Sequence, residues 1–274
     1  MSDLHALFAG VREQLGSRLS GLTLARGRGL HARATTADMP AVADVLQSRF
    51  GADLALMAGD DRRDDAGCFQ VHYVFDHKRD DWYAHVTTDV TPGNLELVSL
   101  AEHSYPASRF EREIRDLFGI TPVGHPDPRP LVRHGFWPED YFPLRRDTLQ
   151  RSFEDDGRPF PFGQVEGPGV YEIPVGPVHA GIIEPGHFRF QCHGEQVMHL
   201  EISLGYQHRG VLRGLNAGDA KRRLHYVETL AGDTSIGHGA EQRRLDPWLH
   251  VRRHGFRQRL RGCRVIRSLK TRLL

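Results

Sequence analysis

The stretch Gly176-Pro-Val-His-Ala-Gly-Ile-Ile-Glu-Pro-Gly-His187 places a histidine and a carboxylate, His179 and Glu184, in a loop rich in glycine and proline. Two segments follow, at 187–192 and 196–204, in which apolar and polar residues alternate. Such alternation is typical of β-strands, and the short glycine-containing connection between them favours an antiparallel hairpin. A loop held by a rigid hairpin often carries functional groups, so these two side chains are the first candidate site residues. A surface hairpin with solvated histidines is the alternative interpretation.

The composition is that of a globular protein. The 274 residues suffice for one large or two ordinary domains, and 39% hydrophobic with 26% charged residues argues against disorder. There is no run of about 18 apolar residues and no signal-peptide pattern at the start, so we expect neither a membrane span nor export. The cysteines, Cys68, Cys192 and Cys263, are far apart and form no CxxC pair, so their spacing does not fit an iron-sulfur, zinc or nickel-iron ligand set.

The N-terminal part predicts a helix on an antiparallel sheet. Residues 1–36 show only a weak helical pattern and are interpreted as a loosely attached lead-in. Asp38 and Pro40 mark the start of a helix, and Gly51 marks its end. Runs of β-branched and aromatic residues, separated by turn residues, then predict a meander of strands at 54–57, 68–75, 82–90 and 95–100. The fold class expected for this domain is α+β.

A second helix, predicted over residues 104–118, ends in Glu111-Arg-Glu-Ile-Arg-Asp-Leu-Phe118 and leads into a loop of histidine, proline and arginine. A salt-bridged amphipathic helix would explain the charges but not the loop. Over residues 37–147 the sequence resembles the C subunit of NADH-quinone oxidoreductase, respiratory complex I. The resemblance implies a docking domain without catalysis, with signature residues at Glu111, Arg112, Glu113, Asp116, His125 and Arg129.

The C-terminal half has a different resemblance. A polar, proline-containing linker is predicted at 148–165, and residues 166–238 resemble the start of the D subunit of complex I and of the large subunits of energy-converting nickel-iron hydrogenases. The two parts in one chain are most similar to the large subunit of formate hydrogenlyase or hydrogenase-4 complexes. The implied fold is a β-hairpin-led start of a mostly helical large-subunit domain after the docking domain.

This resemblance also implies partners and a location. A small iron-sulfur subunit would bind the chain directly, membrane-arm subunits would contact it indirectly, and the chain would be cytoplasmic, peripheral on the inner face of the cell membrane. It implies an oxidoreductase subunit of the NADH dehydrogenase or hydrogenase type that is not active alone. The alternatives are a C/D-type subunit of NADH:quinone oxidoreductase, and a non-catalytic assembly scaffold or inactive remnant.

The resemblance assigns roles to four side chains. Glu184 stands where nickel-iron hydrogenases have a proton-relaying glutamate, and burial would suit this role because it raises a carboxyl pKa toward neutrality. His179 matches the first histidine of a complex I loop whose later histidine contacts quinone; that later histidine has no clear counterpart here, and quinone stays an open alternative. His208 and Arg209 match residues beside the terminal iron-sulfur cluster of the partner protein, where a cation would stabilise the reduced cluster.

The metal-binding motif of the hydrogenases lacks its sulfur donors in this chain. Ala231 and Thr234 occupy its two cysteine positions, and neither side chain supplies the soft thiolate that nickel and iron prefer. We therefore expect no nickel-iron centre and no cofactor bound by this chain itself.

The last part of the chain, residues 239–274, is strongly basic. Ten arginines and one lysine against Glu241 and Asp246 give a net charge of +9 within a chain whose total is +1, so residues 1–238 carry −8. Because family members continue for a few hundred residues, we interpret the chain as truncated and this tail as aberrant, an out-of-frame reading of a GC-rich gene. Binding to an anionic membrane or, with less support, to nucleic acid is the alternative.

Overall fold

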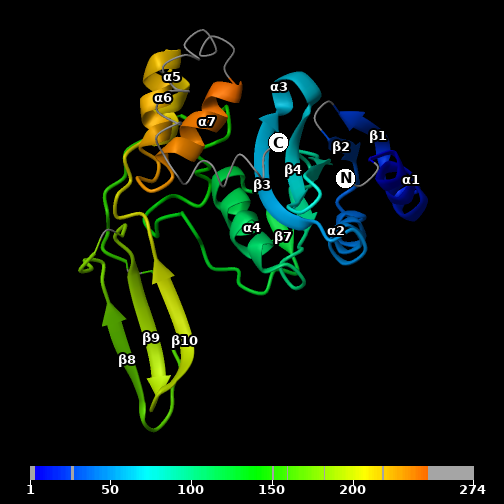
Figure 1. Ribbon diagram of the computed structural model, residues 1–274. Coiled ribbons are helices and arrows are strands. Elements are labelled where there is room, and N and C mark those ends of the chain that lie inside the picture. The colour runs from blue at the N-terminus through cyan, green and yellow to red at the C-terminus, as the bar shows by residue number, and fades with distance from the viewer. Residues whose placement is uncertain are drawn as a thin grey trace, which may run out of the picture. The chain divides into compact units, whose positions relative to one another are not determined.

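The computed structural model describes residues 4–25, 28–149, 151–158, 160–181, 183–217 and 219–245. They belong to two compact units, Met1–Pro161 and a second unit that begins at Phe162. Figure 1 shows the helices and strands of both units. None of the helices among the described residues is long and apolar enough to cross a membrane.

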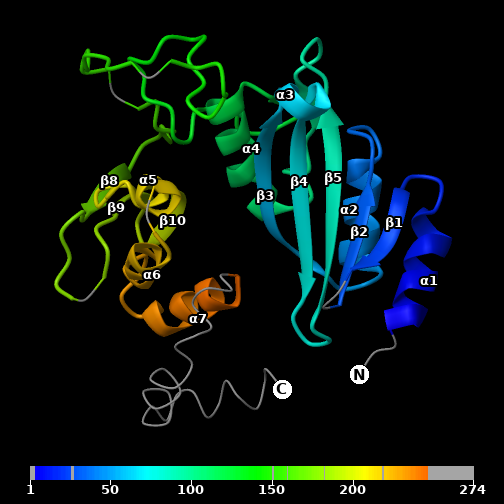
Figure 2. The same cartoon turned by 90° about the horizontal axis from the view of Figure 1, so that it is seen from above.

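The first unit is built on a five-stranded sheet with the strand order β1-β2-β5-β4-β3. Figure 2 shows these strands side by side. Alternate residues of the long strands are buried, and the buried ones form the core with Tyr73, Phe69 and Phe75 as its largest side chains. The strands are β1 (Ser20–Ala25), β2 (Gly29–Arg33), β3 (Asp53–Arg62), β4 (Cys68–His77) and β5 (Trp82–Val90).

This sheet is mixed and not antiparallel as predicted. The pairs β3–β4 and β4–β5 are antiparallel, whereas β2 runs parallel to β5, with Gly29 opposite Tyr83 and Arg33 opposite Thr87. The strands predicted at 54–57, 68–75 and 82–90 are present. The parallel pair was missed because alternation within one strand says nothing about which distant strand lies beside it.

The expected lead-in is an integral part of the first unit. Helix α1 (Leu4–Leu15) buries Val11 and Leu15 in the core, and β1 and β2 form one edge of the sheet. The described part of residues 4–33 is therefore not a loosely attached segment. The predicted helix after Asp38 is α2 (Met39–Ser48), with Pro40 in its first turn and Met39, Val42 and Leu46 fully buried.

Helix α4 (Tyr105–Phe118) organises the rest of the first unit. Pro106 lies in its first turn, and Gly119, with a φ of +73°, ends it by donating its backbone N–H to the carbonyl of Arg115. The helix connects β6 (Glu96–Val98) to β7 (Thr121–Val123), which pair in parallel in a separate two-stranded sheet. The strand predicted at 95–100 therefore leaves the meander, because a helical crossover brings the chain back in the same direction. A short helix, α3 (Arg63–Ala66), joins β3 to β4.

The second unit contains a three-stranded antiparallel sheet and three helices among its described residues. The predicted hairpin is present as β9 (His187–His193) and β10 (Gln196–Ser203), and an unpredicted strand, β8 (Val170–Val175), pairs with β9. Strand β8 contains Pro174, which is tolerated because β8 is an edge strand. The helices are α5 (Val211–Ala217), α6 (Ala220–Glu228) and α7 (Ser235–Leu245).

One face of this three-stranded sheet is apolar and largely exposed. The register aligns Ile173 with Phe190 and Leu200, and Val175 with Phe188 and Ile202, so these side chains share a face. Among them Ile173, Val175, Leu200 and Ile202 are 38–50% exposed.

Most of the basic tail interpreted as aberrant lies outside the described residues. Only its first residues, 239–245, are described, and they continue helix α7. The out-of-frame interpretation stays a prediction.

Candidate functional site

The predicted signature residues cluster around helix α4 and bind the loop that follows it. Glu111 is fully buried; its carboxylate accepts hydrogen bonds from the backbone N–H of Leu100 at 2.6 Å and from the hydroxyl of Ser99 at 2.5 Å. Burial raises the pKa of Glu111, and these two hydrogen bonds oppose the rise. The side chain therefore fixes the end of strand β6 against α4 instead of facing a substrate.

Asp116 is the second buried carboxylate of α4. One oxygen accepts hydrogen bonds from three successive backbone N–H groups, those of Leu131 at 2.6 Å, Val132 at 2.9 Å and Arg133 at 3.1 Å. Its other oxygen accepts from Arg115 at 3.2 Å. A loop has few backbone partners of its own, so the carboxylate supplies the acceptors that the chain there lacks.

Arg112 and His125 complete this loop clamp. The guanidinium of Arg112 donates to the carbonyls of Arg129 and Pro130, both at 2.8 Å, and to Asp127 at 3.0 Å. His125 contacts the carbonyl of Ser108 at 3.1 Å, and its other ring nitrogen accepts from the Asp127 N–H at 2.9 Å. Burial lowers the pKa of His125, which favours the neutral ring.

The structure thus unites most of the signature residues. Arg129 donates to Asp127 at 2.9 Å, and its hydrogen bonds hold the pKa of Asp127 below the usual value. Glu113 is the exception, because it lies on the exposed face of α4. The geometry is that of a locked loop, with its donors and acceptors already committed to one another.

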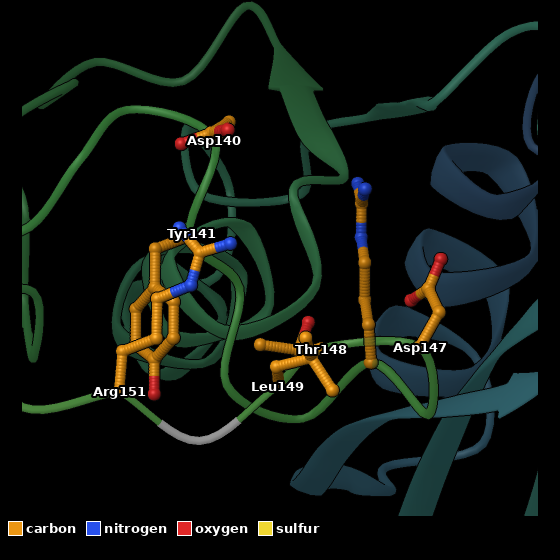
Figure 3. A pocket seen from close by; sticks show the side chains of 7 residues that line it. Asp140, Tyr141, Asp147, Thr148, Leu149 and Arg151 are labelled. Atoms are coloured by element: carbon orange, nitrogen blue, oxygen red, sulfur yellow. The ribbon is translucent and has the colours of Figure 1, made fainter.

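Two hollows lie in the first unit, and the larger one borders this loop. The larger one, about 680 Å³, is lined by arginine, aromatic and proline side chains that include Arg133, Trp137 and Phe142. The smaller one, about 210 Å³, is shown in Figure 3, with Tyr141 and Arg151 on one side and Asp147 on the other. Asp147 accepts hydrogen bonds from the guanidinium of Arg63 at 2.7 and 2.9 Å, which lower the pKa of its carboxyl.

In the second unit, His179 and His187 close the predicted loop. His179 Nε2 lies 2.8 Å from the carbonyl oxygen of Gly186, and His187 Nδ1 lies 3.1 Å from that of Gly176. Gly176 has a φ of +82°, and a Cβ there would lie 2.2 Å from the Gly186 oxygen, so only glycine fits. In this structure His179 therefore holds the two ends of the loop together through its contact with Gly186.

Arg209 brings three distant segments of the second unit together. Its guanidinium lies 3.9 Å from the carboxylate of Glu184 and donates to the carbonyl of Leu230 at 3.2 Å. The neighbouring His208 is exposed. The Glu184 side chain is 62% exposed, so the burial expected of a proton relay is not present within this unit by itself. The roles assigned to these side chains stay predictions.

The positions that hold cysteines in nickel-iron hydrogenases form a tight turn here. The backbone N–H and the hydroxyl of Thr234 both donate to the carbonyl of Ala231, at 3.1 and 3.4 Å. Alanine offers no donor atom and the threonine hydroxyl is a hard, weak one, so this turn does not fit a nickel-iron centre. Within the described ranges, no three histidine, cysteine or carboxylate side chains are arranged to hold a metal ion.

Sequence reasoning missed a strap of residues that holds the start of the second unit. The side chain of Gln191 donates to the carbonyl of Gly163 at 2.6 Å and accepts from the N–H of Val165, and Glu201 accepts from the N–H of Gly163 at 2.8 Å. Residues 163–165, predicted as linker, are thus attached to the polar face of the sheet. The polar residues that alternate along β9 and β10 were the signal in the sequence that could have indicated a bound segment on this face.

The first unit has known relatives. Residues 32–154 match the family described as respiratory-chain NADH dehydrogenase, 30 Kd subunit. The match contains the signature from Glu111 to Arg129, and the resemblance to complex I that the sequence predicted is confirmed.

The chain is also similar to longer proteins of hydrogenase and complex I type. Hydrogenase-4 component G of Escherichia coli (strain K12) is 35% identical over 179 residues, which cover 63% of this chain and 32% of the relative. Formate hydrogenlyase subunit 5 of the same strain is 33% identical over 186 residues, with the same coverage of 63% and 32%. The C/D-type subunit of NADH-quinone oxidoreductase from Bacteroides fragilis (strain ATCC 25285) is 29% identical over 168 residues, which cover 54% of this chain and 31% of the relative. The chain spans about a third of the length of these relatives.

Proposed function

Since residues 32–154 match the 30 kDa-type subunits of respiratory-chain NADH dehydrogenase, we propose that this chain is a subunit of a membrane-associated, energy-converting redox complex. Its first unit would dock the complex together, and its second unit would begin the large subunit that faces a partner iron-sulfur protein. The hydrogenase-4 and formate hydrogenlyase type is favoured over the complex I type.

The observation that carries this choice is the extent of the similarity. The match to hydrogenase-4 component G covers 63% of the chain, whereas residues 32–154 are less than half of it. The similarity therefore includes residues beyond the 30 kDa-type part. The complex I relative is both less identical, at 29% against 35%, and matched over less of the chain, at 54% against 63%.

The geometry of each unit supports a division of labour. The first unit has its charged signature groups locked in hydrogen bonds to backbone, which suits a rigid docking surface and not catalysis. In the second unit, the Arg209 guanidinium and the Glu184 carboxylate lie 3.9 Å apart, so two candidate residues are close to each other. We propose that His208 and Arg209 face the partner's iron-sulfur cluster, where a fixed positive charge favours the reduced cluster.

Purification from native membranes tests the proposal. The chain, tagged and expressed at its natural level, should co-purify with an iron-sulfur protein, with iron and acid-labile sulfide present and nickel at background. Recovery of the chain without iron and sulfide, or only with proteins that carry no such cluster, would contradict the proposal and favour the alternative of a non-catalytic scaffold.

Two activity assays separate the redox alternatives. Membranes from a strain that lacks the gene should lose formate-dependent electron transfer if the chain acts in a complex of the formate hydrogenlyase type; hydrogen is not used as the donor, because the chain is expected to hold no nickel-iron centre. Loss of NADH-driven quinone reduction with the other activities intact would instead assign the chain to the complex I type, with quinone as the acceptor.

A further inference from the structure

His125 is a buried side chain that joins helix α4 to the loop after β7. The side chain is 3% exposed. Its Nδ1 accepts a hydrogen bond from the backbone N–H of Asp127 at 2.9 Å, and its Nε2 lies 3.1 Å from the carbonyl oxygen of Ser108 on α4. A backbone N–H can only donate and a carbonyl oxygen can only accept, so these partners require a lone pair on Nδ1 and a proton on Nε2. The contacts therefore select one tautomer of the neutral ring.

The contact with Asp127 holds a turn at the start of the His125 loop, residues 124–133. A side-chain acceptor that binds the N–H two residues further along the chain is the arrangement that asparagine and aspartate make in Asx turns. The carboxylate of Asp127 in turn accepts from Arg112 at 3.0 Å and from Arg129 at 2.9 Å. The ring of His125 thus supports the residue on which two arginines of this region converge.

A second proton on the ring has to go to Nδ1, because Nε2 already carries one. The imidazolium would then direct an N–H at the N–H of Asp127, so the hydrogen bond would be lost and two donors would face each other without an acceptor. Relief requires the backbone at Asp127 to move away from the ring, and its carboxylate would then leave the position in which Arg112 and Arg129 bind it. Protonation is therefore incompatible with the closed His125 loop.

The charged groups around the ring come from α4 and from the loop. Glu111 lies 4.0 Å from Nε2 and favours the imidazolium, whereas Arg112 and Arg115 on the same helix oppose it. Asp127 also favours it, but this carboxylate is already bound by two arginines. Burial has the largest effect and lowers the pKa of His125. The ring is therefore neutral in the closed loop at neutral pH, and it binds a proton more readily once the loop opens and water reaches it.

We propose that His125 is a proton-operated latch: protonation of its ring releases the Asp127 N–H and opens the His125 loop from helix α4. A histidine whose pKa is lower in the closed state stabilises that state above the open-state pKa of about 6.5, and this stabilisation is lost as the pH falls below that value. Opening should become about tenfold or more favourable between about pH 7.5 and about pH 5. The latch is a property of the folded chain and does not depend on the proposed redox role.

Hydrogen–deuterium exchange of the full-length chain measures this opening. Protection factors, which correct for the intrinsic pH dependence of exchange, are compared for peptides that cover residues 126–134 and, as an internal reference, strand β4. We expect the protection of the loop to fall about tenfold or more between about pH 7.5 and about pH 5, and the protection of β4 to stay constant.

The variant His125→Asn separates the latch from other effects of acid. The asparagine oxygen can accept from the Asp127 N–H as in an Asx turn, but the side chain does not bind a proton in this range, so the loop should stay protected throughout. His103→Asn removes an exposed histidine just before α4 and should retain the wild-type pH dependence. An equal loss of protection in His125→Asn and in the wild type would overturn the proposal and assign the effect to another group, such as Glu111.

Nitrogen-15 NMR of the histidine rings gives a second readout, on the wild-type chain itself. The signals of His125, identified by their absence from the spectrum of His125→Asn or His125→Gln, should show the Nε2–H tautomer at about pH 7.5. The ring should then titrate over the same pH range in which the protection of the loop falls. An Nδ1–H tautomer, or a protonated ring with the loop still protected, would contradict the latch.

Discussion

Asp116 accepts a hydrogen bond from the backbone N–H of Leu131 at 2.6 Å, across fifteen residues of sequence, and the next two amides donate to the same oxygen. A single buried carboxylate thus sets the path of the loop after α4. The signature charge that looks like a surface feature in the sequence is a structural centre of the first unit.

Replacing Asp116 with alanine should destabilise the first unit strongly. The change removes the shared acceptor of three part-buried backbone N–H groups, and an unsatisfied polar group costs about 1–3 kcal/mol where water does not reach it. We expect a loss of about 3 kcal/mol or more in the free energy of unfolding, measured by urea denaturation of the full-length chain with tryptophan fluorescence. Glu102→Ala, at an exposed position just before the same helix, is the control and should change this free energy by less than about 0.5 kcal/mol.

Glu111 and Asp61 should respond to pH in opposite directions. Hydrogen bonds from Arg63, and from the Arg146 N–H, hold the pKa of Asp61 far below its usual value despite burial. A depressed carboxyl pKa contributes stability that is present above the unfolded-state pKa of about 3.9 and is lost as the pH falls through the folded-state pKa. Asp61→Asn should therefore lower stability at pH 7 by about 2 kcal/mol and reduce the loss of stability between about pH 5 and pH 3, measured by urea denaturation at each pH.

For Glu111 the contribution of ionisation to stability has the opposite sign. Burial raises its pKa in the folded state, so its ionisation costs stability once the pH exceeds the unfolded-state pKa of about 4.3. Glu111→Gln keeps an acceptor for Leu100 and removes the charge. We expect its stability relative to the wild type to increase as the pH is raised from about 4 to 8, measured by thermal denaturation at each pH. A stability difference that falls over this range would contradict the buried-charge argument.

Gly119 offers a test of close packing at the end of α4. A Cβ there would lie 2.4 Å from the Arg145 guanidinium and 2.7 Å from the Phe142 ring, in addition to the strain of a φ of +73°. Gly67 has nearly the same φ, +71°, but open space around it. Gly119→Ala should therefore cost about 1–3 kcal/mol more than Gly67→Ala in urea denaturation. Equal losses of stability in the two variants would show that backbone strain alone accounts for the effect.

Gln191 tests the strap of the second unit. Gln191→Ala removes both hydrogen bonds to residues 163–165, and the freed segment should be cleaved several-fold faster by a low concentration of protease. The exposed Gln196, on the neighbouring strand, gives the control Gln196→Ala. Mass spectrometry of the first fragments locates the cut, and unchanged cleavage at residues 148–165 would argue against the strap.

Local signals were sufficient for much of the fold. Pro106 and Gly119 bound α4 as helix chemistry requires. Runs of β-branched and aromatic residues predicted β4 and β5, and alternation of apolar and polar residues predicted β9 and β10. The pairing of strands that are distant in sequence could not be predicted. The parallel pairing of β2 with β5 depends on the whole sheet. Strand β8 was not predicted because it contains Pro174, and proline is rare inside strands other than edge strands.

The candidate site was only partly readable for the same reason. The sequence named Glu184 and Arg209 separately, but their approach to 3.9 Å follows from the fold. The ring contacts of His31, His72 and His85 could not be predicted either, because the three histidines come from three separate strands and become neighbours only through sheet register.

The apolar face shared by β8, β9 and β10 has a practical consequence. Water ordered around Ile173, Leu200 and Ile202 is released whenever two such faces meet, so the chain by itself should self-associate as its concentration rises. Light scattering that grows with concentration and declines in mild detergent would be the signature of this stickiness, and co-production with a partner protein that covers the strands should abolish it.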